Sequence, residues 1–91
     1  MEVRTMADLP DGGKLPDDTV MVLQIRHRGY REIWTYLGLK KAGRWFFTGR
    51  GPHDAGWGAV KRWLAKDGRM VLDWDLYSID QQGKLISMEG H

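Results

Sequence analysis

The chain has no cysteine, and among its 91 residues there are only three prolines and three histidines. Disulfides, thiolate zinc sites and cysteine nucleophiles are therefore excluded. No apolar run approaches the ~20 residues of a membrane-spanning helix, and the start MEVRTMADLP is too polar for a signal peptide. We therefore expect a cytoplasmic protein with no membrane partner.

Charge is sorted along the chain by position. Residues 24–70 carry eleven basic residues against three acidic ones, whereas residues 1–23 and 71–91 are each net −3. Five aromatic residues, between Trp34 and Phe47, lie within the basic segment. A basic segment with interleaved aromatics is typical of surfaces that bind polyanions or acidic protein patches.

The composition of the N-terminal residues differs from the rest. The segment ADLPDGGKLPDD, residues 7–18, combines Pro, Gly and Asp with little that could enter a core. We predict a flexible acidic arm over residues 1–18, followed by one domain over residues 19–91, because a chain of this length builds a single core.

Two turn signals predict a three-stranded meander. Gly29-Tyr30 separates two apolar runs, which predicts a hairpin with a type II′ turn. Lys41-Ala42-Gly43 predicts a three-residue loop with a bulge. The pairs that these turns predict are Ile25 with Trp34, Leu23 with Tyr36, Val22 with Leu37, Lys40 with Arg44, and Gly38 with Phe46.

The second half of the chain reads as a helix and two strands. Asp54 is a candidate N-cap for a helix over residues 55–66, with Gly68 just beyond its end. Residues 70–79 alternate as a half-buried strand, and residues 84–88 form a short last one. The fold class is therefore α+β: an antiparallel sheet of four to five strands, in the order βββαβ(β), packed against one α-helix.

Both faces of the predicted meander are apolar, and one helix covers only one of them. The second must be covered by sheet closure, by the N-terminal arm or by another molecule, so we expect a homodimer or a host-protein partner. The partner-binding residues predicted on this face are Leu37, Leu39, Trp45 and Phe47. The leading hypothesis is a small non-enzymatic binding protein that acts through this patch.

The alternative is a nucleic-acid-binding module that uses the basic meander and the helix. Its predicted contact residues are Arg26, Arg28, Arg31, Lys41, Arg44, Lys61 and Arg62. Glycines before a helix also suggest a weak anion site at Arg50 and Gly51, since free N–H groups at a helix N-terminus favour anions. The two hypotheses differ in salt dependence, because phosphate contacts release counterions.

Catalytic material is sparse. The best candidates for a small hydrolase or a metal-dependent enzyme are His53, Asp54, Asp73 and Asp75, provided that they converge. A strand with a solvated acidic face explains the last two equally well. We therefore predict no enzyme activity, no cofactor and no metal.

The stretch WTYLGLKKAGRWFFTGRGPHDAGWGAVKRWL, residues 34–64, resembles small uncharacterised accessory proteins encoded by actinobacteriophages. This resemblance implies a non-structural protein in the host cytoplasm that binds a host factor or nucleic acid. It carries no functional motif and assigns no site residue. The predicted order of three strands and a helix is also similar to that of plant AP2 DNA-binding domains, whose motifs the chain lacks.

Overall fold

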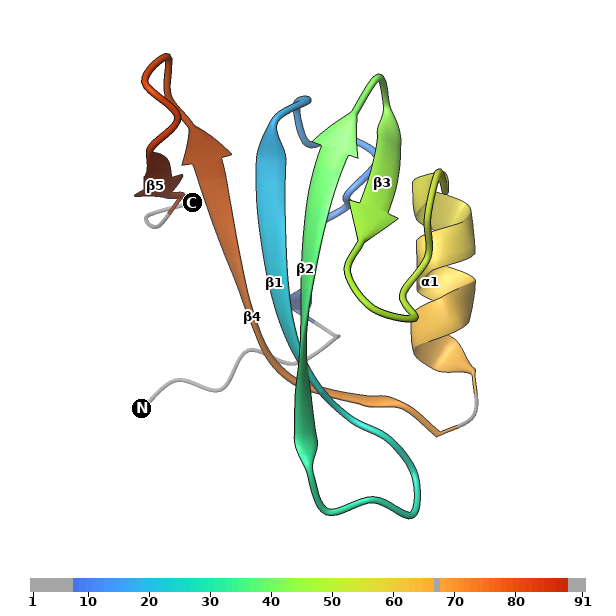
Figure 1. Ribbon diagram of the computed structural model, residues 1–91. Coiled ribbons are helices and arrows are strands. Elements are labelled where there is room, and N and C mark those ends of the chain that lie inside the picture. Colours follow the sequence, from blue (N-terminus) through green and yellow to red (C-terminus); the bar gives the residue numbers. More distant parts are fainter. Residues whose placement is uncertain (1–7, 67, 89–91) are drawn as a thin grey trace.

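The computed structural model describes residues 8–66 and 68–88. One five-stranded antiparallel sheet runs in the order β3-β2-β1-β4-β5, with one helix beside it (Figure 1). The predicted α+β class and the predicted element order are confirmed. The elements are β1 (Thr19–Arg26), β2 (Ile33–Lys41), β3 (Arg44–Phe47), α1 (Trp57–Ala65), β4 (Met70–Ile79) and β5 (Leu85–Ser87).

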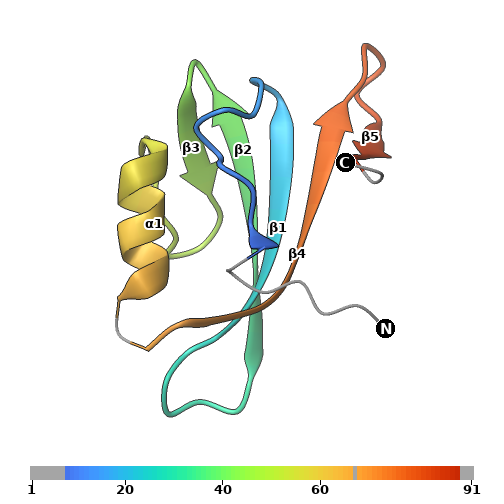
Figure 2. The same ribbon diagram turned by 180° about the vertical axis from the view of Figure 1, so that it is seen from behind.

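The core lies on one face of the sheet. The helix and the segment 8–18 both pack on this side: Figure 2 shows the segment crossing in front of the strands and the helix beside β3. Val60 and Leu64 of α1 are fully buried, as their helical spacing predicts. The other core side chains come mainly from alternate positions of the strands: Met21, Leu23, Ile25, Tyr36, Trp45, Phe47, Ala55, Val71, Trp74 and Leu76.

The predicted register of the first hairpin is confirmed, but its predicted turn is wrong. Pairing ends at Arg26 and Ile33, and the connection is longer than two residues. A turn within it is closed by the amide of Tyr30, which donates to the carbonyl of His27 (3.1 Å). Gly29 has a φ of 85° at the second central position, as in a type II turn. The longer loop places His27 and Tyr30 at the end of the sheet.

The second hairpin differs from its prediction by one residue. Ala42 and Gly43, with φ of 50° and 76°, form a two-residue turn, so that Gly38 pairs with Phe47 in place of Phe46. The carboxylate of Asp17 accepts hydrogen bonds from the amides of Ala42 and Gly43 (2.9 Å each). These contacts offset the strain of a positive φ at an alanine. A one-residue slip moves every side chain of β3 to the other face.

Segment 8–18 is a strap packed on the sheet, which corrects the predicted arm for these residues; residues 1–7 lie outside the described part. Lys40 is only 4% exposed, and its ammonium donates to the carbonyls of Gly12 (3.0 Å), Gly13 (3.2 Å) and Leu15 (2.5 Å). The indole of Trp45 also donates to the Gly12 carbonyl (3.2 Å). A buried cation thus holds the strap.

The predicted C-terminal end of the helix is correct, and the predicted N-cap is not. Its N-cap is Gly56, without a side-chain cap, so the predicted cap at Asp54 is wrong. Asp54 instead accepts from Nε of Arg44 (2.6 Å), at a loop that pairs with the outer edge of β3 through Ala55. At the other end Gly68, with a φ of 67°, lies just past the helix as predicted.

Strand β4 has the predicted bounds and one irregularity. Trp74 and Leu76 face the core, and Asp73 and Asp75 alternate with them. The pairing with β1 shifts between Gln24 and Ile25, so that Val71 is buried where strict alternation with Trp74 would put Leu72. None of the helices in the described part of the chain is long and apolar enough to cross a membrane.

Candidate functional site

The predicted partner-binding residues do not share a face. Trp45 and Phe47 are fully buried in the core, which contradicts their assignment to a partner surface. Leu37 is exposed and Leu39 is half-buried on the opposite side of the sheet, where Phe46 joins them. The physical reason is the one-residue slip of β3, which exchanges the two faces of that strand.

The predicted basic set is also divided. Lys41 and Arg44 lie at one end of the sheet and form ion pairs with Asp18 and Asp54. The hydrogen bond that the Lys41 ammonium donates to the Asp18 carboxylate raises the pKa of Lys41 above its ordinary value. The ammonium therefore favours folding below that ordinary pKa, and the contribution is lost as the pH rises through the raised value.

The remaining basic residues lie elsewhere. Lys61 lines a hollow beside the strap with Trp57, Leu9, Pro10 and Asp11. Arg62 is exposed on α1. Arg26, Arg28 and Arg31 are exposed at or near the first hairpin loop, the opposite end of β2 from Lys41.

Arg50 and Gly51 do not form the predicted anion site together. Gly51 is buried, and a Cβ there would lie 2.7 Å from Cβ of Phe47, so close packing explains this glycine. Arg50 shares a pocket with Trp63, which is in the last turns of α1. The structure therefore places Arg50 away from the start of the helix.

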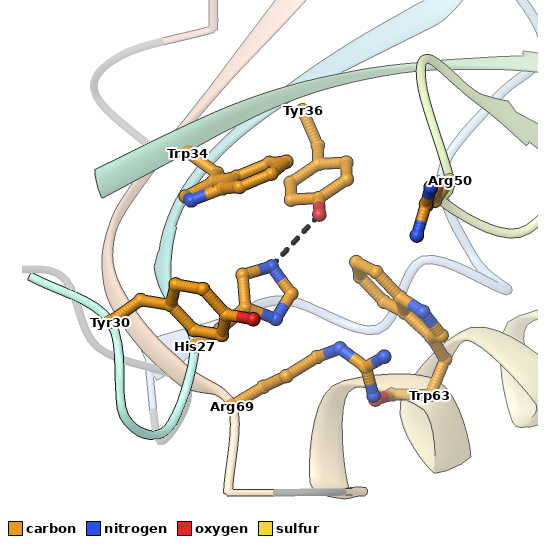
Figure 3. Close-up of a pocket in the computed structure, with 7 residues that line it drawn as sticks. All are labelled: His27, Tyr30, Trp34, Tyr36, Arg50, Trp63 and Arg69. Carbon is orange, nitrogen blue, oxygen red and sulfur yellow. Dashed lines mark hydrogen bonds between the residues drawn. The ribbon is translucent and has the colours of Figure 1, made fainter. Parts of the chain in front are cut away.

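This pocket is lined mainly by aromatic side chains. It has a volume of about 260 Å³ and brings together the first hairpin, the loop after β3 and the end of α1. Figure 3 shows the side chains around one hollow. We call it the aromatic pocket, and it is lined by His27, Tyr30, Trp34, Tyr36, Arg50, Trp63 and Arg69.

The rings of the aromatic pocket form a connected group. His27 Nε2 is hydrogen-bonded to the hydroxyl of Tyr36 (2.9 Å), which is itself buried (Figure 3). Trp34 stands edge-on to His27, with ring centroids 5.4 Å apart, and Trp63 stands edge-on to Tyr36 at 5.1 Å. Their contacts hold these rings in place, whereas Trp34 is still 44% exposed and Tyr30 59%.

The two arginines of the pocket have different roles. Arg69 donates to the carbonyls of Trp63 (2.8 Å) and Lys66 (3.1 Å), and its guanidinium lies over the Trp63 ring at 4.5 Å. It thereby satisfies carbonyls at the helix end. Arg50 is exposed, points toward Trp63 and has no hydrogen bond or ion pair within residues 8–66 and 68–88. The described residues that line the pocket include two arginines and no acid.

The four candidate catalytic residues do not converge. His53 and Asp54 lie beside β3, whereas Asp73 and Asp75 lie on β4, with β2 and β1 in between. Because Ala55, next to Asp54, pairs with the outer edge of β3, four spacings of ~4.8 Å put the two pairs roughly 19 Å apart. Among the described residues, no three His, Asp or Glu side chains are grouped so that they could hold a metal ion.

The sequence patterns give little sign of this pocket. Trp34, Tyr36 and Trp63 have the alternation and helical spacing of buried residues, and Arg69 appeared only as part of the basic segment. One signal was available: Tyr30 follows a turn glycine at a hairpin tip, where a large aromatic has nothing to pack against.

Comparison of the chain with known protein families, curated proteins and solved structures finds no match.

Proposed function

We propose that the protein binds single-stranded nucleic acid without catalysis, and that the aromatic pocket receives one unstacked base. The observation that supports this most is the exposure of Tyr30 and Trp34 beside Arg50, an exposed arginine with no hydrogen bond or ion pair to any residue that the structure describes. Exposed aromatic rings next to a free guanidinium are the elements with which proteins stack bases and contact phosphates. The proposed compartment is the cytoplasm.

The size of the pocket favours a single base. Drug-sized ligands occupy clefts of ≈ 300–1,000 Å³, and this hollow of about 260 Å³ lies just below that range. Stacking on an aromatic ring stabilises a bound base by ≈ 1–3 kcal/mol. His27 and Tyr36, which are polar and held by their mutual hydrogen bond, face the same hollow and can contact the edge of a base.

The distribution of charge favours a single strand over a duplex. A duplex laid on the sheet would meet the face that carries Asp73 and Asp75, and its basic contacts Lys41 and Arg44 are already paired with acids. A base inside a duplex is also stacked and paired, so it reaches a concave pocket only at the cost of unstacking. A host-protein partner stays a prediction. Two of the four side chains expected to anchor it, Trp45 and Phe47, are buried in the core, which weakens its support.

The test is a fluorescence anisotropy titration of a labelled ten-nucleotide thymidine strand at 50 mM and 200 mM salt. We expect binding that weakens with salt, and competition by the unlabelled strand but not by a duplex. Arg50→Gln should weaken binding and reduce the slope of log K against log salt by about one, because one phosphate contact is lost. Arg44→Gln, at the far end of the sheet, is the matched control.

Two results would contradict the proposal. One is no binding of the single strand at 50 mM salt. The other is equal competition by the duplex, together with equal effects of Arg50→Gln and Arg44→Gln, which would assign binding to general surface charge.

A further inference from the structure

The face of the sheet opposite the core carries a continuous apolar band. Paired positions place Phe46, Leu39, Val20 and Tyr77 in one row across four strands, and Leu37 beside Val22 in the next. All six side chains are exposed or half-buried. We call this surface the open face; the sheet in Figure 1 is seen from this side, with the strap behind it.

The open face has no cover within the described residues. The helix and the strap both contact the other face, through Val60, Leu64 and the Lys40 ammonium. An antiparallel sheet with one solvated face normally has polar side chains there. An apolar row that crosses four strands is instead typical of a face that packs against another layer.

We propose that a second copy of this chain covers the open face, in a two-fold symmetric dimer of face-to-face sheets. The two-fold axis is parallel to the strands and lies between the two sheets, above the gap between β1 and β2. It sets β2 of one copy over β1 of the other, and β3 over β4. By the observed register, Leu39 then meets Val20 of the other chain, Leu37 meets Val22, and Phe46 meets Tyr77. The apolar band is therefore complementary to itself, as a two-fold interface requires.

Charge on the open face fits the same axis. The acids Asp73 and Asp75 belong to the β4 side, and the bases Lys41 and Arg44 lie at the end of the β2–β3 side. A rotation that exchanges these two sides sets β4 of one copy over β3 of the other, so Asp73 and Asp75 of the two copies stay at opposite edges of the interface. The acids therefore avoid like-charge contact, which opposes association, and Lys41 and Arg44 are already paired with Asp18 and Asp54 of their own chain.

The size of the face suits a modest dimer. The strands β1, β2 and β4 have 8, 9 and 10 residues and β3 has 4. At ~3.3 Å by ~4.8 Å per residue the projected area is roughly 490 Å², somewhat below the ~600 Å² per partner of the smaller specific interfaces. We therefore expect a dissociation constant in the micromolar range.

The test is the mass of the full chain by sedimentation velocity from 1 to about 500 μM, at 50 mM and 500 mM salt. We expect a monomer–dimer equilibrium that ends near twice the 10.5 kDa chain mass and hardly responds to salt, because the contact is apolar. Leu37→Glu and Phe46→Glu should each raise the dissociation constant at least about 30-fold, as loss of an interface anchor does.

Ile86→Glu is the matched control, because Ile86 on β5 is 49% exposed, close to the 46% of Leu37, but pairs with Ser78, which is not on the open face. It should leave the dimer unchanged. A wild-type chain that stays monomeric over the whole concentration range would overturn the proposal. So would a dimer that survives both open-face variants. Neither result involves nucleic acid, so the proposed function is tested separately.

Discussion

Replacing Lys40 by methionine is expected to lower the free energy of unfolding by about 2–5 kcal/mol. Methionine fills a similar volume but donates no hydrogen bond, so the carbonyls of Gly12, Gly13 and Leu15 lose their contact with the ammonium. Gly12 keeps the indole of Trp45, whereas the exposed Gly13 and the half-buried Leu15 turn to water. A hydrogen bond to a charged group contributes ≈ 1.5–3 kcal/mol, and loss of the three bonds is partly offset because the cost of burying the ammonium is also removed. The variant should therefore release the strap before the sheet unfolds.

Urea denaturation followed by far-UV circular dichroism measures the loss, and hydrogen exchange of residues 8–18 shows whether the strap opens first. Lys41→Met is the control, because the neighbouring lysine is exposed and its ion pair with Asp18 contributes little to stability. Equal stability of the two variants would contradict the role of Lys40. So would unchanged exchange in the strap.

Replacing Trp34 by alanine is expected to weaken single-strand binding by roughly 5-fold to 150-fold, the range that corresponds to ≈ 1–3 kcal/mol for one stacked base. Trp34 is 44% exposed, and its ring lies edge-on to His27 at the rim of the aromatic pocket. An exposed side chain contributes little to the core, so the variant should fold normally.

The same position supplies its own controls for this prediction. Trp34→Tyr keeps an aromatic face and should bind within several-fold of the wild type. Trp34→Leu is apolar without a ring and should lose as much affinity as the alanine variant. Anisotropy with the labelled thymidine strand gives the three dissociation constants. If Trp34→Leu binds like the wild type, stacking on Trp34 is not part of the interaction.

The element order and the first hairpin register were predictable because their signals are local. Alternation from Val20 to Ile25 and from Trp34 to Leu39 sets which residues share a face, and that pattern is complete within each strand. The register of β3 was not predictable in this way. It depends on Asp17, which is distant in sequence and whose carboxylate binds the amides of Ala42 and Gly43.

The aromatic pocket was not predicted because it depends on the length of the helix relative to that of the strands. Helix α1 has nine residues and spans about 14 Å, whereas the nine residues of β2 span roughly 30 Å. The helix therefore covers only part of the core face. Tyr36 is buried beside Trp63, but Trp34, two residues away on the same face, extends past the helix. Alternation assigns a face and does not say where its cover ends.

The most direct test of the proposed function uses the five tryptophans as reporters. Protein labelled with 5-fluorotryptophan gives one ¹⁹F resonance for each of them, assigned by single substitutions. Addition of the ten-nucleotide thymidine strand should shift the resonances of Trp34 and Trp63, which line the aromatic pocket. The resonances of Trp45, Trp57 and Trp74 should stay in place. Saturable binding that leaves Trp34 and Trp63 unshifted would contradict the account.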